Sequence, residues 1–109
     1  MEITSEGWVV LKVTDTDDTI WYKIFSSWRS GDSWRLSSGA TDKSQLVDNG
    51  DHFVWPQQSG TVYLLPKDFE GGMSIYTASV LDDLSSAAQA SGALVERITL
   101  NDAEIEKAH

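Results

Sequence analysis

Cysteine is absent from the sequence, and this absence excludes several kinds of site. Without a thiol, the chain has no disulfide framework, no thiolate metal ligand and no cysteine nucleophile. The absence also fits a reducing compartment. The first residues, MEITSEGWVVLKVTD, lack the basic segment and apolar run that mark a secretory signal. We therefore expect a cytoplasmic protein.

Long apolar runs and basic residues are also scarce. No run approaches the ~20 apolar residues that a membrane-spanning helix requires, so we expect no membrane association. Eight basic residues stand against 17 acidic ones, which gives a formal net charge of -9. This charge repels nucleic-acid phosphates and disfavours direct nucleic-acid binding. It could instead suit a basic protein surface, imitate the phosphates of DNA, or only keep the protein soluble.

Large apolar side chains, by contrast, are well represented. The 109 residues are 40% hydrophobic and include five Trp, three Tyr and three Phe residues. This composition is that of a globular protein, and a chain of this length closes only one hydrophobic core. We expect a single domain over residues 1–109.

Two strands are predicted early in the chain. Residues Trp8–Thr14 are mostly β-branched or aromatic and precede DTDDT, a cluster that favours a turn. The run Thr19–Trp28 alternates between two faces, as a strand does. The spacing of the residues that follow predicts a hairpin.

Two registers compete for this hairpin. A three-residue loop over Ser30–Asp32 places Trp28 opposite Trp34 and separates apolar from charged residues. A two-residue turn places Trp28 opposite Arg35 and mixes them. We prefer the first register, in which Trp28 and Trp34 are core residues.

The preferred register also defines a candidate binding face. Core packing explains most of the aromatic content of a small domain. Two aromatic residues nevertheless fall on the face opposite to the core, beside two arginines, and Trp and Arg are enriched in interface hot spots. The candidate binding residues are Trp21, Phe25, Arg29 and Arg35.

A second hairpin is predicted at Asn49-Gly50, a pair that suits the positive φ angles of a type I′ turn. This turn pairs Asp48 with Asp51. It places three apolar residues on one face: Leu46, Phe53 and Trp55.

Three further elements are predicted: a strand at Thr61–Leu65, a helix from about Tyr76, and a strand at Leu94–Leu100. Ser79 with Asp82 resembles a capping box, and Gly92 lies where the helix should end. Asn101 is predicted to cap a short acidic helix. Together the elements predict an α+β fold. We expect an antiparallel sheet of about five or six strands, with one main helix on one face and the other face wet.

No catalytic residue, metal site or cofactor is predicted. His52 is the only internal histidine, but no Gly-x-Ser-x-Gly motif selects a serine nucleophile for it. We interpret His52 as a strand residue beside a turn. Asp15, Asp17 and Asp18 lack the glycine and distal glutamate of an EF-hand loop, and a solvated turn explains them.

Three segments resemble stretches of small accessory proteins of tailed bacteriophages: WYKIFSSW at Trp21, GDSWRLSSG at Gly31 and SGTVYLLPK at Ser59. The resemblance implies a compact phage protein that acts on a host protein in the host cytoplasm. With the acidic charge and the absence of a catalytic motif, it favours a non-enzymatic binding module that inhibits or redirects a host protein. The alternatives are a small ligand or carbohydrate binder that uses exposed aromatic residues and, third, a small enzyme.

Overall fold

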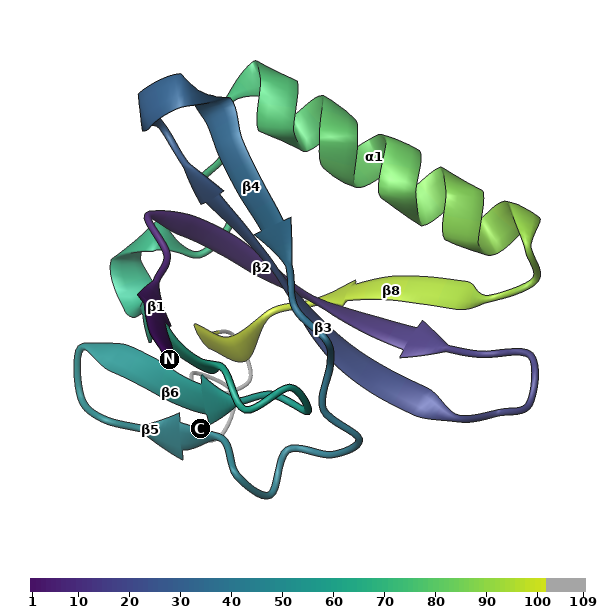
Figure 1. Ribbon diagram of the computed structural model, residues 1–109, viewed down its shortest axis with the longest axis horizontal. Coiled ribbons are helices and arrows are strands. Elements are labelled where there is room, and N and C mark those ends of the chain that lie inside the picture. The colour runs from purple at the N-terminus through teal and green to yellow at the C-terminus, as the bar shows by residue number, and fades with distance from the viewer. Residues whose placement is uncertain (102–109) are drawn as a thin grey trace.

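The computed structural model describes residues 1–101 (Figure 1). A helix, a first sheet and a second sheet form layers that pack on one another. The elements are β1 (Glu2–Thr4), β2 (Gly7–Thr14), β3 (Ile20–Trp28), η1 (Ser30–Asp32), β4 (Ser33–Leu36), β5 (Val47–Asp48), β6 (His52–Pro56), β7 (Val62–Pro66), η2 (Lys67–Phe69), α1 (Ile75–Ala90) and β8 (Leu94–Ile98).

The strands form two four-stranded sheets. The first sheet has the order β4-β3-β2-β8 and is antiparallel throughout, and the second has the order β1-β7-β6-β5 with one parallel pair, β1 and β7. The mixed α+β class is therefore confirmed. The prediction of one sheet with about five or six strands and a wet face is wrong, because the second sheet covers the face of the first that α1 leaves open.

The sequence of β2 explains this arrangement. Trp8 and Val10 point to one side of the strand, whereas Val9 and Leu11 point to the other, and all four are buried. A strand that is apolar on both faces needs a layer on each side. β2 therefore lies at the centre of the molecule, between the second sheet and α1.

The core between the sheets is built on aromatic side chains. Trp8 meets Phe53 of the second sheet edge to face, with ring centroids 6.1 Å apart. Its indole N–H donates to the carbonyl of Pro66 at 2.8 Å. Tyr22 and Trp55 make a second aromatic contact between the sheets, at 5.9 Å. The buried residues of this core are Trp8, Val10, Ile24, Phe53, Trp55, Tyr63, Leu65 and Leu100.

The core beneath α1 is smaller. Leu81 of the helix packs against Val9, Leu11 and Phe25 of the first sheet. The N-cap of the helix is Ser74, whose hydroxyl accepts from the N–H of Thr77 at 3.2 Å. The predicted start near Tyr76 is therefore confirmed, and the predicted capping box at Ser79 and Asp82 is wrong. The end of the helix is as predicted.

That end is a Schellman motif at Gly92. The N–H of Gly92 donates to the carbonyl of Gln89, and the N–H of Ala93 donates to that of Ala88. These bonds satisfy carbonyls of the last turn. They also reverse the chain, so that β8 returns beneath the helix and pairs with β2.

The segment before α1 is fixed to the start of β2 by a close backbone approach. The N–H of Gly71 donates to the carbonyl of Trp8 at 2.7 Å, and the Ser27 hydroxyl donates to the carbonyl of Gly72 at 3.2 Å. A Cβ atom on Gly7 would lie 1.7 Å from the Gly72 carbonyl oxygen. Only glycine fits there, and the contact positions the beginning of the helix.

The first hairpin adopts neither of the two predicted registers. Trp28 lies opposite Ser33, and Ser27 lies opposite Trp34, so the connection is one residue longer than the loop that we preferred. This shift by one residue moves each side chain of β4 to the opposite face of the sheet. Trp34 moves to the side of Phe25 and is 40% exposed, so its predicted place in the core is wrong. Trp28 is only partly buried.

The second hairpin forms where predicted, but its turn is shifted. The N–H of Asn49 donates to the carbonyl of His52, and Gly50 with Asp51 occupies the centre of the turn. Among these residues only Gly50 has a positive φ, of 91°, which fits a type II′ turn and not the predicted type I′ turn. Asp48 now faces Phe53, a slip of two residues that leaves each side chain on its predicted face.

The two strands predicted in the second half of the chain, after the second hairpin, are confirmed. β7 and β8 occupy the segments predicted at Thr61–Leu65 and Leu94–Leu100, each shifted or shortened slightly.

The short acidic helix predicted after Asn101 lies outside the described residues. Asn101 itself donates its side-chain amide to the carbonyl of Lys67 at 2.9 Å. None of the described helices is long and apolar enough to cross a membrane.

Replacing Gly50 by Val should destabilise the protein by about 1 to 3 kcal/mol, because a β-branched residue is strained at positive φ. A side chain at this position meets no atom within 4 Å, so the loss would report backbone strain alone. Gln45→Val, at an exposed position with ordinary φ, is the control. Equal unfolding free energies for the two variants in urea would contradict the assigned turn.

The two kinds of tryptophan should respond differently to truncation. Trp55 is fully buried, so Trp55→Ala should cost about 3 to 5 kcal/mol. Trp34 is partly exposed and should lose mainly its stacking on Phe25, about 1 to 2 kcal/mol. Thermal and urea unfolding of both variants measures the difference. A Trp34→Ala protein as unstable as Trp55→Ala would mean that the observed register is incorrect.

Candidate binding surfaces

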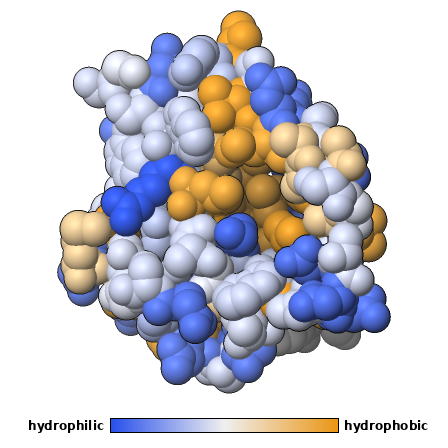
Figure 2. Space-filling view, turned by 45° about the vertical axis from the view of Figure 1, so that its right-hand side comes forward, coloured by the Kyte–Doolittle hydropathy of each residue, from blue (hydrophilic) through white to orange (hydrophobic). Residues whose placement is uncertain are grey.

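One side of the molecule carries a hollow surrounded by apolar side chains (Figure 2). It lies between the C-terminal half of α1 and the first sheet and has a volume of about 470 Å³. We call this hollow the groove. A second surface of interest lies at the other end of α1, where large apolar side chains are exposed.

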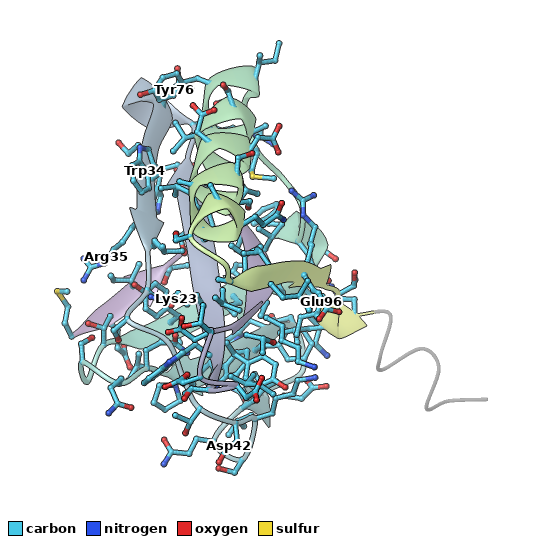
Figure 3. The ribbon with its side chains drawn as sticks, turned by 90° about the vertical axis from the view of Figure 1, so that its right-hand side faces the viewer. Lys23, Trp34, Arg35, Asp42, Tyr76 and Glu96 are labelled. Carbon is cyan, nitrogen blue, oxygen red and sulfur yellow. The ribbon has the colours of Figure 1, made fainter. Side chains whose placement is uncertain are left out.

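The second surface consists of Trp34, Ile75 and Tyr76, which we call the aromatic patch. The Trp34 ring stacks on the buried Phe25 ring at 5.8 Å, with an angle of 15° between the ring planes. Trp34 and Tyr76 line the same shallow depression beside η1 (Figure 3). Ile75, adjacent to Tyr76, is 93% exposed, and Tyr76 is 55% exposed.

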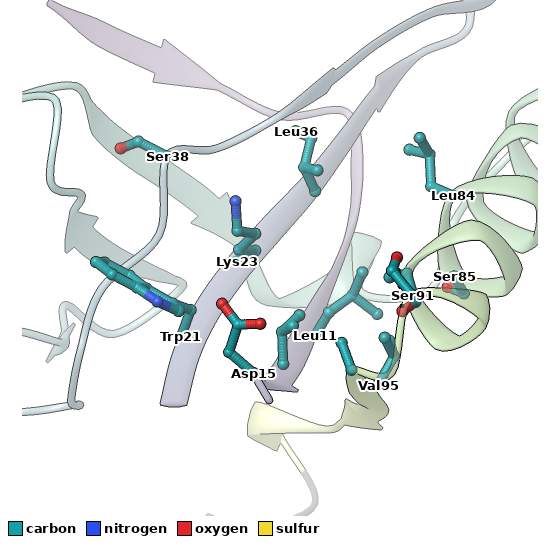
Figure 4. Close-up of a pocket in the computed structure, with 13 residues that line it drawn as sticks. Leu11, Asp15, Trp21, Lys23, Leu36, Ser38, Leu84, Ser85, Ser91 and Val95 are labelled. Atoms are coloured by element: carbon teal, nitrogen blue, oxygen red, sulfur yellow. Dashed lines mark hydrogen bonds between the residues drawn. The ribbon is translucent and has the colours of Figure 1, made fainter. Parts of the chain in front are cut away.

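The groove exists because the side chains of α1 become small toward its C-terminal end. Leu81 fills the space above Phe25, but Ser85 and Ala88, one and two turns further on, do not reach the sheet as Leu81 does. Apolar side chains of the sheet therefore stay accessible beneath them (Figure 4). The apolar lining of the groove comprises Leu11, Val13, Leu36, Leu84 and Val95.

Polar side chains border the groove on the side of β3. Lys23 and Trp21 come from β3, Asp15 follows β2, and Ser38 follows β4 (Figure 4). The Ser38 oxygen accepts from the N–H of Ser59 at 2.9 Å, which leaves its own hydrogen to donate. Among residues 1–101 the ion pairs are His52 with Asp51 and Lys67 with Asp48, so neither Lys23 nor Asp15 belongs to one.

The structure separates the four residues predicted to form a binding face. Trp21 borders the groove, but Phe25 is fully buried beneath Trp34. Arg29 is exposed at the start of η1. Arg35 lies on the opposite face of the sheet, where its Nε donates to the Tyr63 hydroxyl at 3.1 Å. The shared exposed face is therefore wrong: Leu81 of α1 and Trp34 cover Phe25, and the observed hairpin register turns Arg35 to the other face. A binding role for Trp21 stays a prediction.

Sequence reasoning missed the aromatic patch. Ile75 falls on the same stripe of the helix as Ser79, Asp82 and Ser86. A large apolar residue on a polar stripe points to solvent, so the pattern held a signal for its exposure. Trp34 is exposed because of the hairpin register, and no local pattern in the sequence indicates that register.

His52 has the surroundings of a turn residue. Its Nδ1 lies 2.8 Å from the Asp51 carboxylate, and its Nε2 lies 3.4 Å from the Asn49 side-chain amide. The hydrogen bond with His52 holds the pKa of Asp51 below its ordinary value. Both imidazole nitrogens thus face residues of the hairpin turn.

Several serines are buried, and their hydroxyls are engaged in the structure. Ser5 donates to Ser26 at 2.7 Å between the sheets, and Ser37 donates to Gln57 at 2.6 Å. These bonds satisfy polar groups that are closed to solvent. Within the described part of the chain, no three acidic or histidine side chains converge as a metal site.

Comparisons of the chain with protein-family models, with curated proteins and with solved structures found no match. The geometry of the groove and of the aromatic patch therefore carries the functional argument. Both surfaces expose large apolar side chains.

Filling the groove should stabilise the protein. Ala88→Leu adds apolar contacts with the sheet beneath it and should raise the unfolding free energy by roughly 0.5 to 2 kcal/mol, as cavity-filling changes do. Ala87→Leu places the same side chain on the exposed side of α1 and should change stability little. Urea unfolding compares the two. A destabilised Ala88→Leu protein would show that the groove has no room.

Proposed function

We propose that the protein is a non-enzymatic, acidic binding module that contacts a partner protein through the aromatic patch. The position of Trp34 supports this proposal most directly. Its side chain is 40% exposed, and its ring is held nearly parallel to the buried Phe25 ring. A large ring held in place on the surface loses little entropy on binding.

The neighbours of Trp34 extend this surface. Tyr76 and Ile75 add two exposed side chains at the start of α1, and the close approach of Gly7 to Gly72 fixes that start. Trp and Tyr are the residue types that most often dominate the binding energy of interfaces. Exposed apolar patches on small soluble proteins commonly mark such contact sites.

The net charge of -9 supports a partner with a basic surface, because opposite charges around an apolar contact steer association and select partners. The resemblance to phage accessory proteins makes a bacterial host protein the partner to seek. In this proposal the protein acts by occupying or redirecting that host protein. No catalytic step is required.

A comparison of captured proteins tests the proposal. The wild-type protein, immobilised and exposed to a bacterial lysate, should retain a basic protein that a Trp34→Ala, Tyr76→Ala double variant releases. A Val47→Ala, Leu94→Ala variant removes two other exposed apolar side chains and should retain it. Thermal unfolding confirms that each variant is folded. Retention of the same protein by the double variant would refute a role for the aromatic patch.

A further inference from the structure

The groove is a second binding site, separate from the aromatic patch. We propose that it binds a short apolar peptide of two or three residues with a free amino group and a free carboxylate. The apolar lining accommodates the side chains, Lys23 meets the carboxylate, and Asp15 meets the ammonium group. These two charges border one apolar space, Lys23 from β3 and Asp15 from the turn that follows β2.

The spacing of the two charges selects a ligand with separated ends. Lys23 lies opposite Leu11 in the sheet, and Asp15 follows Leu11 by four residues. At a rise of ~3.4 Å per residue, this places the backbones of Lys23 and Asp15 roughly 14 Å apart along the sheet. The side chains do not pair with each other in the structure. A molecule that satisfies both must therefore reach from one to the other.

The backbone of Trp21 lies between those of Lys23 and Asp15 along the sheet, because Trp21 is opposite Val13, which is two residues before Asp15. The Trp21 ring packs beside Gly39, on the side of β3 away from β2, and borders the groove there. A ring at this place gives a bound peptide a flat apolar surface at the edge of the groove. This assigns to Trp21 the ligand contact that the sequence predicted for it.

Other classes of ligand leave one charge unsatisfied. An apolar anion would pair with Lys23 and leave Asp15 without a partner from the ligand, and an apolar cation would do the reverse. An uncharged apolar molecule would remove water from both charges and replace it with nothing. A zwitterion with an apolar body pairs with both. The volume of about 470 Å³ is in the range of sites for small molecules.

Titration with three forms of one peptide tests this proposal. The tripeptide Leu-Ala-Leu with free ends should bind and shift the backbone NMR signals of residues around the groove. Acetylation of its amino end, or amidation of its carboxyl end, should each weaken binding roughly threefold to tenfold, the effect of one partly exposed charge-assisted contact. Equal binding of the three forms would overturn the proposal.

Two variants assign each end of the peptide. Lys23→Met should bind the free and the amidated peptides equally, while it still distinguishes the acetylated form. Asp15→Asn should show the opposite pattern. Lys12→Met removes a lysine from the other face of β2 and should behave as wild type. Ala88→Leu, which fills the groove, should abolish binding.

The remaining outcomes count against the proposal. Signal shifts confined to the aromatic patch, or no shift at millimolar peptide in the folded wild-type protein, would show that the groove is not a peptide site. A Trp34→Ala, Tyr76→Ala protein should bind the tripeptide normally. The result with the tripeptide is thus independent of the result with the partner protein.

Discussion

The burial of β2 on both faces is the constraint on which the other layers depend. Trp8 and Val10 require an apolar layer on one side, and Val9 and Leu11 require one on the other. The second sheet meets the first need and α1 meets the second. The cover that α1 provides is incomplete. Beyond Leu84 the helix side chains that face the sheet are small, and the groove begins there.

Local structure could largely be predicted from the sequence, whereas registers and layers could not. Alternation identified the strands, and Gly92 identified the end of α1, because these signals act over a few residues. Each hairpin register depends on how the loop fits the packed sheet, so Trp34 was assigned to the wrong face and the turn at Gly50 was displaced. The second sheet depends on pairing between distant segments, including β1 with β7, which no local pattern specifies.

The candidate binding surfaces, too, could be predicted only where they depend on local sequence. Trp21 was selected for its residue type and does border the groove. Phe25 lies on the predicted face of β3 but is covered by α1, and Arg35 was selected through a register that the structure does not adopt. The groove depends on short side chains of α1 lying above distant strands. Its apolar lining gathers residues from β2, β4, α1 and β8, so only the folded chain brings the two charges and the lining together.

The pairing of β2 with β8 also sets when the protein can fold during synthesis. Val10 pairs with Ile98, and Glu2 of β1 pairs with Val62, so strands made first wait for partners made much later. Pairings over such distances close long loops and slow folding. On the ribosome, β2 and β3 can form their hairpin early, but the face of β2 that carries Val9 and Leu11 stays uncovered until α1 has been made. The nascent chain therefore exposes this apolar face while the roughly 60 residues between β2 and α1 are added.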